Sequence, residues 1–327
     1  MWQGENMKNT NRVQECGEYI DAQGIEAAMA NYGISRETAR RYSRGYREDQ
    51  GTTNTEKFNR ESNVIKQLKD RFTVQELESI ANGKAINPDQ QNMPVINFDG
   101  DDVRIGFCTD THIGSKYFPK HYWESFLEEC YKTNVNMIIH SGDLIEGMSN
   151  RPDQIYSLTH VGYSAQMDYA AELLKMTDLP IKIIDGNHDR WGIKSGGVFA
   201  VKDIAARLGH VEFIGHDQGI IDINGTTWMP WHGEDSGSYA TSYRLQKLIE
   251  AFTGGTKPQV ILAGHTHKQG YFFERNIHAV TGGALSMQSA WMRGKRLANH
   301  DGFHIIRATI ADKEIKSFSP TWYPFYN

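Results

Sequence analysis

The chain has 327 residues, a formal net charge of −5 and a pI near 6.2. This length is enough for one large hydrophobic core plus a small accessory domain. The acidic balance excludes a wholly basic coat protein, so any affinity for nucleic acid must come from a local patch. No stretch approaches the ~18 consecutive apolar residues of a membrane span, and the N-terminus lacks the pattern of a signal peptide. We therefore expect neither a membrane segment nor export.

The cysteines are few and do not form a metal-binding motif. Cys16, Cys108 and Cys130 are widely spaced and odd in number, and no C-x-x-C pair occurs. Cys108 lies in a predicted buried strand. This pattern is typical of reduced thiols, and it predicts a cytoplasmic protein.

Residues 1–48 are predicted to form a small all-α domain that resembles a helix-turn-helix. Helices are expected over residues 13–22, 25–32 and 36–47. Gly33 is expected in the turn, and Ser35 is expected to cap the third helix. Small residues should lie where the second and third helices touch, among them Ala39.

The third predicted helix is rich in arginine. Side chains of this kind could grip phosphates or contact guanine edges in the major groove, which makes the helix a candidate for DNA binding. The alternative is a solvated helix in a module that contacts protein. The candidate DNA-binding residues are Arg36, Arg40, Arg41, Arg44 and Arg47.

Residues 49–94 are predicted to be a polar linker followed by a helical neck, and residues 95–327 to be the larger domain. In that domain, apolar runs alternate with helical patterns, which favours a layered α/β fold. One helical face is expected to include Tyr122, Phe126 and Tyr131, and a second to include Leu173 and Met176. Strands are expected over 271–273, 278–281, 302–310 and 314–319.

Five motifs with histidine or aspartate each follow a hydrophobic run that is typical of a buried strand. Ligand-binding side chains are expected to gather where such strands end. The motifs are Asp110-Thr-His112, Gly142-Asp143, Gly186-Asn187-His188-Asp189, His232-Gly233 and Gly264-His265-Thr-His267.

These motifs supply nitrogen and oxygen donors without a thiolate. Such a set suits manganese, iron, zinc or magnesium rather than a structural Cys-rich zinc site. In Asp-x-His and His-x-His, alternate side chains lie on the same side of an extended segment and can reach one ion. One carboxylate must bridge two ions, and Asp143, alone in its motif, is the candidate.

The order of the five motifs resembles that of the calcineurin-like metallophosphoesterase superfamily. The resemblance implies a four-layer α/β/β/α sandwich, in which the four strands expected after residue 270 would form the second sheet. Two divalent ions are implied as well, manganese above all. It assigns Asp110, His112, Asp143 and His267 to the first ion, and Asp143, Asn187, His232 and His265 to the second. It also implies that His188 contacts the scissile phosphate and that Asp189 orients the His188 imidazole.

The resemblance implies hydrolysis of a phosphoester by a water that two metal ions activate. Because a predicted DNA-binding domain precedes the catalytic one, we expect a phosphodiester in DNA, as in SbcD-type nucleases. Glu146 departs from that branch, which often has a histidine three positions after the aspartate. The stretch from Leu144 to Gly147 departs from protein phosphatases, in which an Asp-Arg-Gly sequence follows and its arginine binds phosphate. A small-molecule or cyclic-nucleotide phosphodiesterase is the main alternative, and a protein phosphatase is disfavoured.

Further residues are expected near the site. Arg151, Tyr156 and His160 lie in a longer excursion that should border it, whereas His210 and His216 are expected to be ordinary histidines. Residues 286–296 mix aromatic and basic side chains, as a nucleic-acid groove would, or form a loop that packs on the core. DNA is the expected partner, and the sequence leaves open a homodimer or a partner ATPase.

Overall fold

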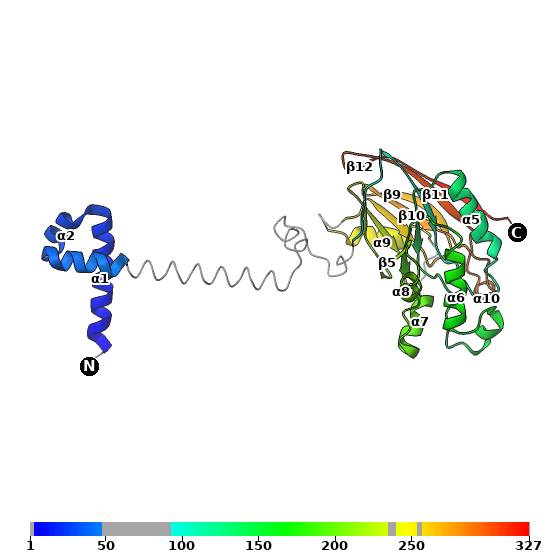
Figure 1. Ribbon diagram of the computed structural model, residues 1–327, viewed down its shortest axis with the longest axis horizontal. Coiled ribbons are helices and arrows are strands. Elements are labelled where there is room, and N and C mark those ends of the chain that lie inside the picture. Colours follow the sequence, from blue (N-terminus) through cyan, green and yellow to red (C-terminus); the bar gives the residue numbers. More distant parts are fainter. Residues whose placement is uncertain (1–2, 48–92, 235–239, 254–256, 327) are drawn as a thin grey trace. The chain divides into compact units, whose positions relative to one another are not determined.

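The computed structural model describes residues 3–47, 93–234, 240–253 and 257–326, with side chains from residue 12 onward. It divides into two compact units, Met1–Lys84 and Ala85–Asn327 (Figure 1). The predicted linker and neck over residues 49–94 lie almost wholly outside the described residues.

The first unit contains the three expected helices. They are α1 (Gln3–Gln23), α2 (Ile25–Tyr32) and a helical stretch over residues 36–47. Helix α1 begins ten residues earlier than the sequence predicts. Gly33 ends α2 with a left-handed φ of 60°, a conformation that costs glycine little. Ser35 caps the next helix, because its Oγ accepts a bond from the Thr38 amide at 3.2 Å.

Small side chains let these helices pack closely. Ala28 on α2 and Ala39 on the third helix are both fully buried, and they share a core with Cys16, Ile20 and Tyr42. The predicted role of Ala39 at this contact is therefore confirmed. The DNA-binding helix-turn-helix interpretation stays a prediction.

The second unit contains two six-stranded sheets. The first sheet has the order β12 (Glu314–Pro324), β11 (Gly302–Ala311), β2 (Asp102–Cys108), β3 (Met137–Ser141), β4 (Ile181–Asp185) and β5 (Val211–His216). The second sheet has the order β1 (Val95–Ile96), β6 (Ile221–Ile223), β7 (Thr226–Trp231), β8 (Val260–Ala263), β10 (Ile277–Gly282) and β9 (Gln269–Glu274). Strands β2 to β5 run parallel, and so do β7, β8 and β10.

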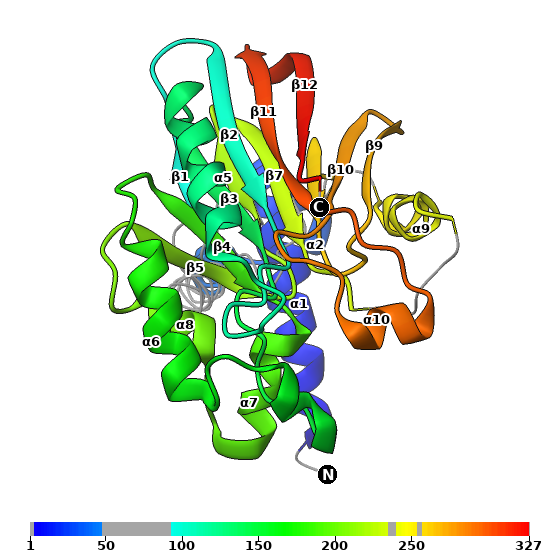
Figure 2. The ribbon, with the colours of Figure 1, turned by 90° about the vertical axis from the view of Figure 1, so that its right-hand side faces the viewer.

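Helices cover both outer faces, which gives the predicted four layers (Figure 2). Helices α5 (Lys120–Lys132), α6 (Tyr163–Leu174) and α8 (Ala200–Ala205) pack on the first sheet, and α9 (Tyr243–Ala251) packs on the second. The remaining helical segments are η2 (Pro152–Ser157), α7 (Asn187–Gly196) and α10 (Ala290–Lys295). The α/β/β/α expectation is confirmed.

Period-two alternation explains the layers. Val103, Ile105 and Phe107 of β2 point between the sheets, where they share a cluster with Trp228 of β7. Cys108 belongs instead to the cluster under the helices. A strand buried on both faces in this way must be apolar, as β2 is from Ile105 onward, whereas its charged residues Asp102 and Arg104 lie at its less buried beginning.

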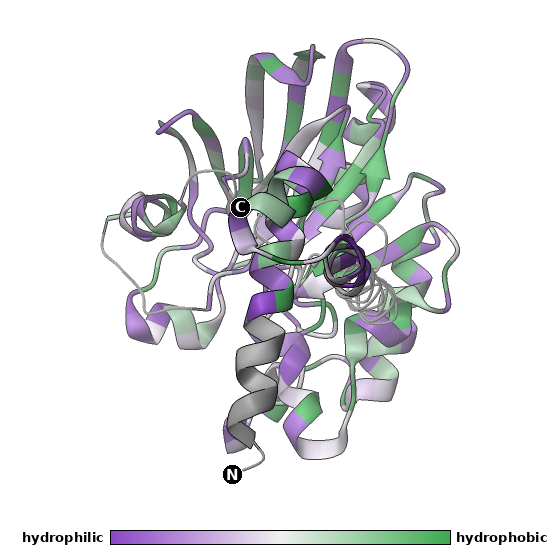
Figure 3. Ribbon diagram, turned by 90° about the vertical axis from the view of Figure 1, so that its left-hand side faces the viewer, coloured by the Kyte–Doolittle hydropathy of each residue, from purple (hydrophilic) through white to green (hydrophobic). Residues whose placement is uncertain are grey.

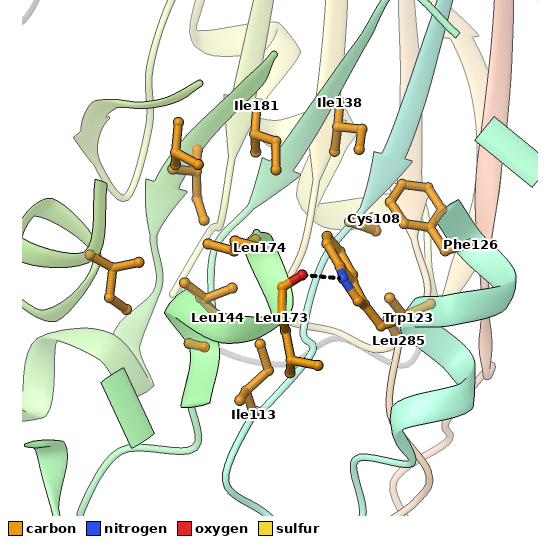
Figure 4. Packing of buried hydrophobic residues seen from close by; sticks show 14 of the residues in the cluster. Cys108, Ile113, Trp123, Phe126, Ile138, Leu144, Leu173, Leu174, Ile181 and Leu285 are labelled. Atoms are coloured by element: carbon orange, nitrogen blue, oxygen red, sulfur yellow. Dashed lines mark hydrogen bonds between the residues drawn. The ribbon is translucent and has the colours of Figure 1, made fainter. Parts of the chain in front are cut away.

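Helices α5 and α6 are joined by a buried hydrogen bond as well as by apolar contacts (Figure 4). The indole Nε1 of Trp123 on α5 donates to the Leu173 carbonyl of α6 at 2.9 Å. Trp123 is almost fully buried, so its polar N–H needs this partner.

Three expectations for this unit are corrected. Strands β11 and β12 do not belong to the second sheet, because β11 pairs antiparallel with β2 and so extends the first. Tyr131 on α5 is 48% exposed, with its hydroxyl bonded to Thr177 and Asp178. Met176 lies beyond the end of α6 and is 41% exposed.

The outermost strands are less buried than the central ones. None of the residues of β9 and β12 is fully buried, and hydrophobic and hydrophilic bands alternate along strands at the top of the view in Figure 3. Among the described residues, no helix combines the length and apolar character that crossing a membrane requires.

Candidate metal centre

The five motifs lie where strands end. Those of the first sheet follow β2, β3 and β4, which are parallel neighbours. Those of the second sheet follow β7 and β8, which are also parallel neighbours. All five therefore open at the carboxyl edges of the two sheets, which are the positions where ligands bind in folds of this kind.

Five of the seven predicted metal ligands have a left-handed backbone. This conformation costs a non-glycine residue about 1–2 kcal/mol, so it persists only where neighbouring contacts enforce it. One such contact is the bond from the Asp110 amide to the Gly142 carbonyl at 3.0 Å. The φ values are 52° for Asp110, 49° for His112, 53° for Asp143, 70° for His265 and 53° for His267.

Two glycines let the loops approach one another. Gly142 has a φ of 89°, and a Cβ there would lie 2.8 Å from the Gly186 amide nitrogen. A Cβ on Gly186 would collide with the Asp143 carboxylate. Both positions need glycine because any side chain would separate the donor-bearing loops.

The first group of donors contains Asp110, His112 and His267, as the sequence predicts. The Nε2 atom of His267 lies 3.2 Å from Asp110 Oδ1 and 3.2 Å from His112 Nε2. All three side chains are buried. Their donor atoms therefore converge on one point.

The second group contains Asp143, His232 and His265. His232 Nε2 lies 3.3 Å from Asp143 Oδ2 and 3.0 Å from the side-chain oxygen of Asn187. Asp143 Oδ2 also lies 3.9 Å from His112 Nε2 of the first group. The Asp143 carboxylate thus lies between the two groups, where a bridging ligand would be.

The outer nitrogens of two histidines have hydrogen-bond acceptors that orient their rings, and that of a third lies beside a carboxylate. His232 Nδ1 lies 2.8 Å from the Ser141 carbonyl oxygen, and His267 Nδ1 lies 2.6 Å from the side-chain oxygen of Asn299. His112 Nδ1 lies 3.1 Å from Glu146 Oε2, although it is not well aligned for a hydrogen bond. Such partners fix the tautomer that leaves Nε2 free to coordinate a metal.

The charge of this centre fits divalent ions. Asp110 and Asp143 are almost completely buried, and in the described part of the chain neither pairs with a lysine or arginine. Buried carboxylates need hydrogen bonds and positive charge, and among the described residues the side chains beside them that can carry positive charge are histidines. Residues with this donor set and this deficit of positive charge fit a two-metal site.

The histidine pKa values show the same demand for positive charge. Burial opposes the charged form of His232, but the carboxylates of Asp143 and Asp110 and the Ser141 carbonyl together raise the pKa of His232 to about 10. Burial likewise opposes the charged form of His112, but Glu146 raises the pKa of His112 to about 9. Binding of a metal ion has to displace such protons.

His188 is adjacent to this centre but is oriented differently from our expectation. Its Nδ1 lies 2.8 Å from the Glu146 carbonyl oxygen. The Asp189 carboxylate instead accepts bonds from the backbone amides of Leu144, Ile145 and Gly186 at 2.8–3.1 Å. The prediction that Asp189 orients the His188 imidazole is therefore wrong, and Asp189 joins the loops after β3 and β4.

Glu146 is the residue to which sequence reasoning gave no role. Its carboxylate faces His112 and accepts a bond from the Gln154 side chain at 3.1 Å, while its carbonyl fixes His188. It is held there because its amide donates to the Ile113 carbonyl at 2.9 Å. In the sequence, the only indication that Glu146 contacts the centre is its position three residues after Asp143.

A cavity of about 510 Å³ opens above the centre, and Arg151 and Trp191 line it together with the predicted ligands. His160, which was expected to border the site, stacks on Tyr169 and is not part of the cavity lining. His210 and His216 bond to the Leu174 carbonyl and to Asp185, as ordinary histidines do.

Comparison with known families agrees with this geometry. A model of the calcineurin-like phosphoesterase superfamily domain matches residues 103–296, more than half of the chain. The chain belongs to this superfamily. The matched range includes all seven predicted ligands and His188.

Curated relatives of this superfamily member are archaeal DNA polymerase II small subunits. That of Halobacterium salinarum is 23% identical over 60% of this chain and 46% of its own length. That of Archaeoglobus fulgidus is 25% identical over 59% of this chain and 48% of its own. The chain thus spans about half the length of the curated relatives it matches.

Solved structures of phosphoesterases also match at low identity. A structure described as a novel archaeal phosphodiesterase is 18% identical, covering 68% of this chain and 100% of its own, with a TM-score of 0.40. YfcE, a phosphoesterase from E. coli, is 18% identical, covering 66% and 98%, with a TM-score of 0.38.

Proposed function

We propose that the chain is a metal-dependent hydrolase of phosphodiester bonds in DNA. The observation that carries this proposal is the convergence of two donor groups on the Asp143 carboxylate, inside a cavity that a phosphate can enter. Asp110, His112, Asp143 and His267 would hold one ion, and Asp143, Asn187, His232 and His265 the other.

The residues of the chain would hold the ions in place, and His188 would carry a proton. Bound there, two divalent ions would supply Lewis acidity, neutralising phosphate charge and making water a stronger acid. His188 lines the cavity, and the Glu146 carbonyl accepts its Nδ1 proton. Its Nε2 is then the atom that can exchange a proton with a leaving group. Burial lowers the pKa of His188, which favours the neutral ring when no substrate is present.

Two observations support DNA as the substrate. The curated relatives are named as subunits of a DNA polymerase, and the first unit presents an arginine-rich helix. Arg36 pairs with Glu26, and Arg47 pairs with Asp21 at 2.8 Å. Within residues 12–47, Arg40, Arg41 and Arg44 form no ion pair with a carboxylate, so their charge is available to phosphates.

A small-molecule or cyclic-nucleotide phosphodiesterase would use the same seven ligands and is the second candidate. A protein phosphatase is disfavoured, because the stretch from Leu144 to Gly147 contains no arginine that could bind a phosphate. A scaffold without activity is disfavoured by the complete donor set.

A substrate panel tests the proposal. Purified protein with manganese is expected to hydrolyse single-stranded DNA, duplex DNA or both, together with a bis-aryl phosphate, and to leave a phosphopeptide intact. Hydrolysis of the bis-aryl phosphate alone would favour the small-molecule alternative. Inactivity on every diester with manganese, iron, zinc and magnesium would contradict the proposal.

The arginine helix has its own test. Replacing Arg40, Arg41 and Arg44 with alanine is expected to weaken duplex DNA binding. Each lost phosphate contact should flatten the slope of log K against log salt by about 0.9. Binding is measured at several salt concentrations, with bis-aryl phosphate hydrolysis on the other unit as the control for folding.

A charge-matched variant controls for net charge. Replacing Arg307, Lys313 and Lys316 with alanine removes the same charge from the edge of the first sheet, and it should leave the slope unchanged. An unaltered slope in the Arg40, Arg41 and Arg44 variant would instead indicate that the helix contacts protein.

A further inference from the structure

The wall of the cavity carries aromatic rings that the chemistry of hydrolysis does not use. Tyr117, Trp191 and Trp291 line it together with the predicted metal ligands. Trp291 lies on α10 and is 49% exposed. A single exposed ring would need no explanation, but several aromatic rings around one cavity are typical of a ligand-binding groove.

Helix α10 holds Trp291 outward rather than in the core. Met292, the next residue, is 8% exposed and anchors the helix. Ser289 caps it, since its Oγ accepts a bond from the Met292 amide at 3.2 Å. The Met287 amide donates to the Tyr117 carbonyl at 2.8 Å, which fixes the preceding segment. Residues 286–296 thus combine both interpretations: Met292 and Trp291 both line the cavity, but Met292 is buried whereas Trp291 is half exposed.

Cations lie beside two of these rings, those of Trp291 and Tyr117. The Arg151 guanidinium lies 4.6 Å from the centroid of the Trp291 ring. Lys116 and Arg293 lie 5.4 Å and 5.9 Å from the centroid of the Tyr117 ring.

These cations have no acidic partner in the described part of the chain. They are held by neutral groups: Arg293 donates to the Gln288 carbonyl at 2.7 Å, and Lys116 donates to the Tyr156 carbonyl at 3.0 Å. A guanidinium without a carboxylate partner keeps its charge available for an anion.

Rings for stacking beside unpaired cations are the features that bind unpaired nucleotides. Bases of a duplex are already stacked and hidden, whereas those of a single strand expose their faces to aromatic side chains. We propose, resting on the function above, that Trp291 stacks on a base and that Arg151 and Arg293 contact phosphates, so the cavity receives single-stranded DNA. The strand would lie along α10 and the Tyr117 loop, with one phosphate at the metal centre.

The test measures binding without hydrolysis. Full-length protein in chelator is titrated with a labelled oligothymidylate of about eight nucleotides, within the usual range of about 4–16 per binding site. Trp291→Ala is expected to weaken binding by about one to two orders of magnitude, because stacking contributes about 1–3 kcal/mol per base. Trp291→Phe should retain most of the affinity.

Two more variants make the test specific. Phe273→Ala removes an aromatic side chain that is 58% exposed on β9 and does not line the cavity, so it should leave binding unchanged. Arg293→Gln should flatten the salt dependence by about 0.7 in slope, the value for one phosphate of a single strand. This variant also keeps the test valid if Trp291→Ala fails to fold.

Two outcomes would overturn the inference. Unchanged oligothymidylate affinity in folded Trp291→Ala would show that the ring does not stack on a base. Thymidine monophosphate binding as tightly as the oligomer would show that the cavity takes a small nucleotide. The proposed function is judged separately, by wild-type hydrolysis of duplex DNA and of a bis-aryl phosphate with manganese, so either idea can fail without the other.

Discussion

Replacing Asp143 with alanine is expected to remove bound metal and activity together. Asp143 Oδ2 lies 3.3 Å from His232 Nε2 in one donor group and 3.9 Å from His112 Nε2 in the other. Loss of this carboxylate therefore affects both predicted ions. Removal of outer partners alone typically costs about 10–100-fold in metal affinity, so we expect a loss of at least 100-fold here. Metal content per chain, measured after dialysis, is the direct readout.

The Asp143 experiment needs a control for stability. Asp143→Asn keeps the shape of the side chain but lacks its charge, and it should also lose metal. Asp185 is another buried carboxylate, but it pairs with Arg190 at 2.9 Å and belongs to neither donor group. Asp185→Asn should lower the unfolding midpoint and keep both ions. Two ions per chain in folded Asp143→Ala would contradict the bridging role.

The position of the centre could be predicted from sequence because it depends on strands that are locally encoded. Apolar runs before Asp110, Asp143 and Asn187 predict buried strands, and parallel neighbours necessarily end at the same edge of a sheet. Donor residues after such runs must therefore lie close together, and the structure brings all seven together.

The contacts of Glu146 could not be predicted in this way. They require the loop after β3 to run beside the loop after β2, with a bridge between Ile113 and Ile145. No local pattern specifies that two loops will pair. The wrong role given to Asp189 has the same cause, because its carboxylate was free to face either His188 or the backbone amides of the neighbouring loop.

The strand with which β11 pairs also depends on residues far away in the sequence. The sequence of residues 302–311 predicts a strand, but either sheet offers an edge to which it could add. In the structure it covers the edge of β2, where His304 pairs with Phe107 in register. Period-two patterns define the face of a strand and leave its neighbour undefined.

Replacing His188 with alanine is expected to keep both metal ions while slowing turnover. Its Nδ1 is held by the Glu146 carbonyl, and its ring lies against Trp191 with centroids 4.0 Å apart. The ring is therefore fixed with Nε2 available to the cavity. Loss of a general acid typically costs about 10²–10⁴-fold in rate.

The size of this loss should depend on the leaving group. An alkoxide such as the sugar oxygen of DNA needs a proton as it departs, whereas nitrophenolate is stable without one. His188→Ala should therefore be much more damaging on a dinucleotide or alkyl ester than on bis-nitrophenyl phosphate. The two rate ratios are measured on the same preparation, after its metal content has been determined.

Added imidazole provides the complementary measurement. The alanine variant leaves a space beside Trp191 in which a free imidazole fits, and an imidazole there can return the missing proton donor. We expect imidazole to restore part of the rate on the poor leaving group and almost none on the good one. Equal losses on both substrates, without rescue, would mean that His188 only positions the substrate or the metal ligands next to it.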